Sequence, residues 1–115
     1  MKPDGEPIAI DIDRTAEYLR IRPHGDINLA SSPTLRQTLH AALSEGDERV
    51  DIMLSDVPYM DSSGVATLVE ALQQCRRQDR DLRLVAPTDR VNSIFQIAKL
   101  DTIFVIVTSD EAGGD

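Results

Sequence analysis

The 115-residue chain has few aromatic residues, one cysteine and no tryptophan. Because only 3% of the residues are aromatic while 41% are hydrophobic, the core must consist mainly of aliphatic side chains. The single thiol, Cys75, excludes an internal disulfide, and we interpret it as a structural residue. No apolar run approaches the roughly 20 residues that span a bilayer. The start, MKPDGEPIAI, also lacks the apolar segment of a signal peptide, so we expect a cytoplasmic protein without membrane insertion.

Basic residues form no run, and the formal net charge is −8 at pH 7. This balance argues against direct binding to DNA or RNA. The sequence lacks the glycine-rich motifs that hold nucleotide phosphates. Its aspartates are scattered, without histidine or cysteine neighbours at the spacing of metal ligands. We therefore expect no cofactor and no metal ion.

Apolar periodicity divides the first half of the chain into three elements. Alternation over residues 7–12 and 16–22, with Asp13–Thr15 as the turn, predicts an antiparallel hairpin. A helix follows, with Ser32 as its cap, Pro33 at the first helical position and Gly46 closing it. RVDIMLSDV, residues 49–57, is a dense run typical of a central strand buried on both faces.

The second half continues the alternation of helices and strands. Apolar residues from Val65 to Cys75 recur at steps of three and four, which predicts a helix ending in the charged, exposed segment RRQDRD at residues 76–81. The strand LRLVAP (82–87), a helix capped by Thr88 and the strand TIFVIV (102–107) complete the series. The order β-β-α-β-α-β-α-β indicates one α/β domain, residues 1–108, in which helices pack on a mixed sheet with an N-terminal hairpin. We expect residues 109–115 to form a flexible tail.

The segment YMDSSG, residues 59–64, is the candidate site because it leaves the most buried strand, where functional loops usually lie. Asp61, Ser62 and Ser63 could each cap the next helix, yet one cap suffices. Gly64 is a poor helix former, so its position suggests a tight turn or the close approach of another molecule. A phosphate on one serine would carry about −1.5 to −2 charges at the positive end of the helix, where the domain tolerates it. An interface facing a carboxylate or an apolar patch would not tolerate it.

Three segments together resemble a known family: MDSSG after an apolar strand, LRLVAP, and VNSIFQIAKLDTIFVI at residues 91–106. They resemble the STAS domain of bacterial anti-sigma factor antagonists. The resemblance extends back through LRIRPHGDINLASSPTLRQTLHAAL and covers nearly all residues from about 7 to 107. The topology deduced from the apolar pattern is the one that this family has.

The resemblance implies a regulatory phosphoprotein that controls transcription through protein–protein interaction. Ser62, the first serine after Asp61, would be the phosphoacceptor, which leaves Ser63 to serve the helix. Unphosphorylated, the chain would bind an anti-sigma factor that is itself a GHKL-type serine kinase, and so free a sigma factor. The kinase would end this binding by phosphorylating Ser62, and a serine phosphatase would restore it. The partner supplies ATP and the catalysis, so the chain is not an enzyme on this interpretation.

The implied partner surface combines two loops, and two features depart from the family pattern. The surface would consist of Met60, Asp61, Ser62, Ser63 and Gly64, with Asp26 and Asn28 from the loop HGDIN. Many relatives have an acidic residue at the position of Asn28. Many also end in a further amphipathic helix, for which TSDEAGGD is too short and too rich in glycine.

Two other functions remain open at this point. STAS-like domains also serve as docking subunits of membrane transport systems, including lipid ABC transporter complexes. A hydrolase could instead use Ser62 or Ser63 as nucleophile, which requires a base within hydrogen-bond reach. His24 lies in a loop and His40 in a helix, and Met60 stands where a nucleophile elbow needs glycine.

Overall fold

Five strands form one mixed sheet in the order β1-β2-β3-β4-β5 in the computed structural model, which describes residues 8–108. β1 pairs antiparallel with β2, and all later neighbours pair in parallel. This arrangement confirms the predicted α/β fold and the order of its strands and helices. The expected tail at 109–115 and the first seven residues of the expected domain lie outside the described residues. The elements are β1 (Ala9–Arg14), β2 (Tyr18–His24), α1 (Ser32–Leu43), β3 (Arg49–Met53), α2 (Ser62–Arg77), β4 (Leu82–Val85), α3 (Asp89–Ile97), the 3-10 helix η1 (Leu100–Thr102) and β5 (Val105–Val107).

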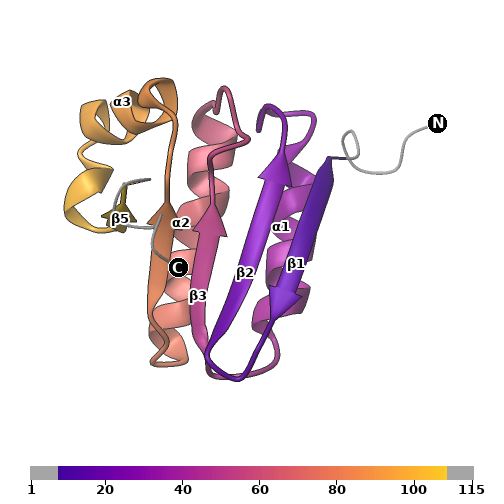
Figure 1. Cartoon of the computed structure of the whole chain (residues 1–115). Helices are drawn as coiled ribbons and strands as arrows, with labels where there is room; N and C mark the ends of the chain where they lie inside the picture. The colour runs from indigo at the N-terminus through magenta and orange to yellow at the C-terminus, as the bar shows by residue number, and fades with distance from the viewer. Residues whose placement is uncertain (1–7, 109–115) are drawn as a thin grey trace.

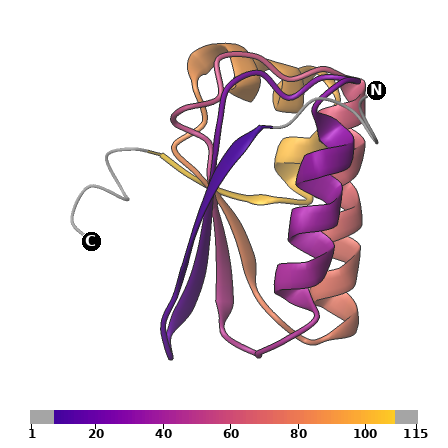
Figure 2. The ribbon, with the colours of Figure 1, turned by 90° about the vertical axis from the view of Figure 1, so that its right-hand side faces the viewer.

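The helices α1 and α2 lie side by side on one face of the sheet, and no described helix covers the other face (Figures 1 and 2). The alternation in β2 explains this asymmetry, because Leu19 and Ile21 are fully buried while Arg20 and Arg22 are half-buried. Between sheet and helices lies an aliphatic core, as the composition predicts. Its few aromatic members include Phe95 and Phe104, whose ring centroids are 6.1 Å apart. Within residues 8–108, no helix combines the length and apolar character that crossing a membrane requires.

The hairpin turn lies two residues later than the sequence pattern indicates. The hydroxyl of Thr15 accepts hydrogen bonds from the backbone N–H groups of Glu17 and Tyr18, both at 3.1 Å. These bonds place the turn at residues 15–17 rather than at Asp13–Thr15. The first strand therefore ends at Arg14 instead of residue 12, and the second begins at Tyr18 instead of residue 16.

The start of α1 also differs from the expectation. Ser31, not Ser32, occupies the N-cap position, and Ser32 is the first helical residue, so Pro33 is the second. The Ser31 hydroxyl makes no capping bond to the helix, because it donates to the Asp26 carbonyl and accepts from the Asn28 N–H. The chain before α1 is thus held by its own turn rather than by a helix cap.

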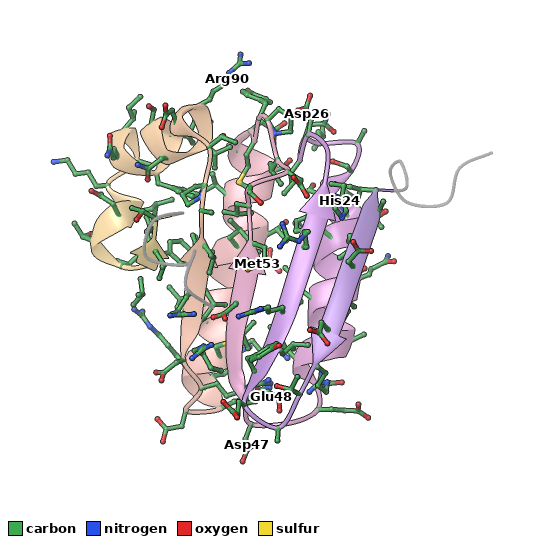
Figure 3. All side chains as sticks on the ribbon, in the orientation of Figure 1. His24, Asp26, Asp47, Glu48, Met53 and Arg90 are labelled. Atoms are coloured by element: carbon green, nitrogen blue, oxygen red, sulfur yellow. The ribbon has the colours of Figure 1, made fainter. Side chains whose placement is uncertain are left out.

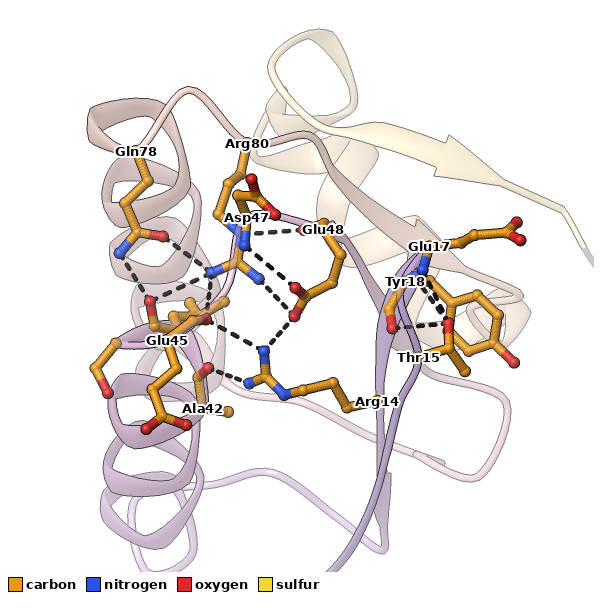
Figure 4. A network of polar contacts seen from close by, with 12 residues as sticks. Arg14, Thr15, Glu17, Tyr18, Ala42, Glu45, Asp47, Glu48, Gln78 and Arg80 are labelled. Carbon is orange, nitrogen blue, oxygen red and sulfur yellow. Dashed lines mark hydrogen bonds and ion pairs between the residues drawn. The ribbon is translucent and has the colours of Figure 1, made fainter.

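The end of α1 is held by an arginine that the sequence pattern assigned to an exposed segment. Arg80 has a fully buried side chain, which corrects that prediction. Its guanidinium donates to the carbonyl of Leu43 at 3.3 Å, to the carbonyl of Glu48 at 3.0 Å and to the Glu48 carboxylate at 3.2 Å (Figure 4). Arg14, from β1, donates to the same carboxylate and to the carbonyl of Ala42. These arginines satisfy carbonyls that a helix end leaves unpaired.

The final strand is shorter than predicted. Instead of a strand over 102–107, the chain forms η1, and only Val105–Val107 pairs with β4. The N–H groups of Ile103 and Phe104 both donate to the carbonyl of Leu100, which closes the turn and buries Phe104. Cys75 is fully buried on α2, and burial raises the pKa of its thiol, in keeping with the structural role predicted for it.

Candidate functional site

Two loops meet at the carboxyl ends of β2 and β3. Ile27, in the loop before α1, forms an isolated parallel bridge with Met60, in the loop before α2. The N–H of Ile27 donates to the carbonyl of Tyr59, and the N–H of Asp61 donates to the carbonyl of Ile27, each at 3.0 Å. The segments HGDIN and YMDSSG therefore lie side by side, as the family resemblance implies. Figure 3 shows His24, Asp26 and Arg90 at this end of the molecule, opposite to Asp47 and Glu48.

Asp61 is the residue that caps α2. Its Oδ1 accepts hydrogen bonds from the N–H groups of Ser63 at 2.9 Å and Gly64 at 3.3 Å. Its Oδ2 accepts from the N–H of Leu29 at 3.0 Å and so ties the neighbouring loop to the start of the helix. The hydrogen bond from the Ser63 side chain is the main cause that lowers the pKa of Asp61, with the backbone donors adding to it.

The two serines differ sharply in their surroundings. The half-buried Ser63 donates its hydroxyl hydrogen to Oδ1 of Asp61 at 2.5 Å, and its carbonyl accepts from the Thr67 hydroxyl at 2.9 Å. Ser62 is the first residue of α2 and is exposed. Within residues 8–108, the Ser62 hydroxyl makes no hydrogen bond. The fold thus uses one serine of the pair and leaves the other open to solvent.

Gly64 and Met60 are buried, so neither offers a side chain to a partner in this conformation. A Cβ atom on Gly64 would lie 2.5 Å from Cγ of Met60 and 2.7 Å from Cγ2 of Ile27. The close approach that the sequence suggested at Gly64 is therefore made by the protein's own core. Met60 and Gly64 therefore pack beneath the loop. The exposed part of the expected partner surface consists of its polar residues.

Asn28 and Asp26 have different positions in the neighbouring loop. Oδ1 of Asn28 accepts hydrogen bonds from the N–H groups of Ala30 at 3.0 Å and Ser31 at 3.1 Å, so this half-buried side chain holds the turn before α1. Asp26 is exposed. The side-chain amide of Asn28 therefore stabilises the turn, and the carboxylate of Asp26 carries the negative charge of this loop at the surface.

Two features of this end are not apparent from the sequence pattern. Leu29 is 77% exposed beside Asp61. The guanidinium of Arg90, from the start of α3, lies 5.0 Å from the centre of the Tyr59 ring, a cation–π contact. Neither has a local sequence signal, because both depend on how separate loops come together in the fold.

The histidines do not complete a hydrolytic site with the serines. Nε2 of His24 lies 2.8 Å from Oδ2 of Asp11, and Nδ1 lies 3.1 Å from Oδ2 of Asp56. Both ring nitrogens of His24 thus face carboxylates rather than Ser62 or Ser63. His40 is exposed on α1, where it lines a groove between α1 and α2 together with Arg36 and Glu70. In the described part of the chain, no group of three or more His, Cys, Asp or Glu side chains is placed to hold a metal ion.

Comparison with known proteins agrees with this architecture. The model of the STAS domain family matches residues 9–112. The chain is 30% identical over 106 residues to the anti-sigma-B factor antagonist of Bacillus subtilis (strain 168), covering 92% of this chain and 96% of that protein.

Two solved structures of SpoIIAA share the fold. The anti-sigma factor antagonist SpoIIAA in its unphosphorylated form is 23% identical, with a TM-score of 0.75 over 90% of this chain and 92% of the other. The Bacillus cell fate determinant SpoIIAA in the phosphorylated form is 22% identical, with a TM-score of 0.68 over 90% and 96%. On the family match and the identity to the Bacillus subtilis protein, the chain belongs to the STAS domain family.

Proposed function

We propose that this protein is an anti-sigma factor antagonist switched by phosphorylation of Ser62. In this function the unphosphorylated protein binds a GHKL-type serine kinase that acts as an anti-sigma factor in the cytoplasm, and thereby frees a sigma factor. Phosphorylation of Ser62 ends the complex, and a serine phosphatase restores it. The names of the Bacillus subtilis relative and of SpoIIAA support the antagonist function.

The exposure of Ser62 is the observation that carries the proposal. A kinase needs a hydroxyl that it can reach, and Ser62 is exposed at the first position of α2 while Ser63 is engaged with Asp61. Modifying Ser62 breaks no hydrogen bond within the described residues, so the domain can gain the phosphate without losing a structural contact.

The electrostatics at Ser62 favour a phosphate that weakens a complex without unfolding the domain. A phosphate at the start of a helix gains up to about 2 kcal/mol from the helix dipole in favourable geometry. The neighbouring carboxylate of Asp61 opposes it, and exposure to water screens both effects. In a complex, water leaves the interface and the added charge is no longer screened. The phosphate therefore weakens the complex far more than it weakens the domain.

The proposed partner surface consists of exposed and half-exposed groups from both loops. Ser62, Asp61 and Asp26 contribute polar groups, and Leu29 adds an apolar one. Met60, Gly64 and Asn28 position these groups from below. This protein supplies a binding surface and a phosphoacceptor, and the partner supplies catalysis and ATP, so we do not propose an enzyme.

Mass spectrometry after incubation with the cognate kinase and ATP tests the proposal. We expect one phosphate on wild type and on Ser63→Ala, and none on Ser62→Ala. Phosphate on Ser63 would move the switch by one residue. An absence of phosphate, together with recovery of a transporter ATPase in a pulldown from cell extract, would instead favour a docking subunit of a membrane transport complex.

A further inference from the structure

A hollow of about 460 Å³ lies at the amino ends of β3 and β4, beside the end of α2. Among the described residues it is lined by four arginines, Arg49 from β3, Arg83 from β4, Arg76 from α2 and the buried Arg80, together with the acidic Asp81. The remaining walls are apolar and include Ile103 and Val105. The formal charge of the whole chain is −8, so this is a local concentration of positive charge on an acidic protein.

The arginines around the hollow differ in how their charges are matched. Arg49 and Arg83 each donate two hydrogen bonds to the same buried carboxylate, Asp51, at distances of 2.9 to 3.1 Å. The charge of Arg80 is matched by Glu48. Arg76 is exposed, and its one hydrogen bond among the described residues is a 3.5 Å contact with the carbonyl of Ile103. Among the described residues, Arg76 has no carboxylate within ion-pair distance, so its positive charge is available to an anionic group.

The apolar wall is open rather than enclosing. Val105 is 58% exposed and Ile103 is 38% exposed. Sites for small molecules bury some 70 to 90% of the ligand and are more enclosed than this. Arginines beside exposed aliphatic side chains are instead typical of protein–protein interfaces, where arginine is enriched.

We propose that this hollow is a docking site for an acidic segment of a partner protein that carries an aliphatic side chain. The aliphatic side chain packs against Ile103 and Val105, and the flanking carboxylates meet Arg76 and the outer face of Arg49. Ser62 and Arg76 lie at opposite ends of α2, about 21 Å apart at 1.5 Å per residue. A partner in the hollow therefore leaves the Ser62 end free, and the proposal does not depend on the phosphorylation switch.

Fluorescence anisotropy with short labelled peptides tests the site on the full chain. The probe is the peptide EDELEDE, with QNQLQNQ as its uncharged control and EDESEDE as the control without an aliphatic side chain. Arg76→Gln removes the exposed cation of the hollow. Arg77→Gln removes the same charge from the adjacent exposed position of α2, which does not line the hollow, and is the matched control.

We expect saturable binding of EDELEDE, weakened about fivefold or more by Arg76→Gln and less than about twofold by Arg77→Gln. Val105→Thr, which keeps the shape of the side chain, should weaken EDELEDE but not the already weaker EDESEDE. Three results would overturn the proposal: no saturable binding of EDELEDE, equal losses for the two arginine variants, or equal affinity for QNQLQNQ. A gain of about fivefold on replacing Asp110 and Glu111 by Asn and Gln would also overturn it, because the chain's own acidic residues would then be the occupant.

Discussion

The hydroxyl of Ser63 lies 2.5 Å from Oδ1 of Asp61, while the hydroxyl of the adjacent Ser62 points to no hydrogen-bond partner in the described chain. The same carboxylate accepts hydrogen bonds from the N–H groups of Ser63 and Gly64, so Ser63 belongs to the capping structure of α2. The two serines are one residue apart, yet only one of them stabilises the fold.

Replacing each serine by alanine should therefore affect stability unequally. Ser63→Ala removes a hydrogen bond to a charged group, which typically contributes about 1.5 to 3 kcal/mol, and partial exposure should place the loss at the lower end. Ser62→Ala should change the free energy of unfolding by less than about 0.5 kcal/mol. Urea denaturation at pH 7 measures both. A larger loss for Ser62→Ala than for Ser63→Ala would contradict the assignment of roles.

A charge placed at Ser62 should weaken the proposed complex with an anti-sigma factor while leaving the fold intact. We expect Ser62→Asp to reduce affinity by about tenfold or more, since each 1.4 kcal/mol is a factor of ten and a carboxylate only partly imitates a phosphate. Titration calorimetry with the purified kinase measures the change.

Gln73→Asp is the matched control for this experiment. It introduces the same charge at an exposed position of the same helix, about three turns from Ser62. We expect its affinity to stay within about twofold of wild type. Equal losses for the two variants would indicate general repulsion rather than a local interface.

The apolar periodicity of the sequence was sufficient to predict a mixed sheet with an N-terminal hairpin, the order of the elements along the chain and the three helices, because alternation and helical spacing report which face of an element is buried. It was not sufficient at the ends of elements. The hairpin turn and the start of α1 differ from their predicted positions because of side-chain hydrogen bonds of Thr15 and Ser31. An apolar pattern does not record such bonds. The turn at η1 shortened the last strand because Phe104 packs into the core.

The position of the candidate site in the fold was predictable, but the packing of its side chains was not. The position of MDSSG after a buried strand located the loop, and the adjacent loop was expected beside it. The sequence could not reveal that Gly64 and Met60 face Ile27, since this contact joins residues far apart in the chain. Nor could it reveal that Arg80 is buried, because its partners include backbone carbonyls of Leu43, at the end of α1, and of Glu48, which precedes β3.

Gly64→Ala tests the contact beneath the loop. Alanine is normally the better helix former by about 1 kcal/mol, so propensity alone predicts a gain in stability. The added Cβ would lie 2.5 Å from Cγ of Met60 and 2.7 Å from Cγ2 of Ile27, and such overpacking typically costs about 1 to 3 kcal/mol. We expect a net loss in urea denaturation. Gln73→Ala, at an exposed position of the same helix, should show no loss, and a gain at Gly64 would contradict the packing argument.

The buried carboxylate Asp51 should make stability depend on pH. Burial opposes its charge, but hydrogen bonds from Arg83 and Arg49 outweigh burial and lower the pKa of Asp51 below its ordinary value of 3.8. A carboxyl group with a lowered folded pKa stabilises the protein fully above its unfolded pKa, and this contribution is lost as the pH falls through the folded value. Wild-type stability should therefore decline below about pH 4.

The variant Asp51→Asn tests the contribution of Asp51 to the pH dependence of stability. The substitution removes the charge that the guanidinium groups of Arg20, Arg49 and Arg83 share. Breaking a buried ion pair costs about 3 to 5 kcal/mol, less where the arginines keep contact with water as here. Urea denaturation over a pH series should show a less stable variant at pH 7 whose stability falls less steeply in acid than that of wild type. Parallel curves for the two proteins would show that Asp51 does not provide the pH dependence.

The exposed side chain of Leu29 gives the proposed partner surface an apolar element that can be tested by itself. Leu29 is 77% exposed, so Leu29→Ser should leave the free energy of unfolding within about 0.5 kcal/mol of wild type. In a complex that buries this side chain, the same change removes about 1.5 to 3 kcal/mol of apolar burial, which corresponds to roughly tenfold or more in affinity for the kinase. Ile97→Ser, at a position that is 83% exposed on α3, is the matched control and should leave the affinity unchanged. If calorimetry finds the Leu29 variant as tight as wild type, the partner does not cover the loop before α1, and the surface must be restricted to the start of α2.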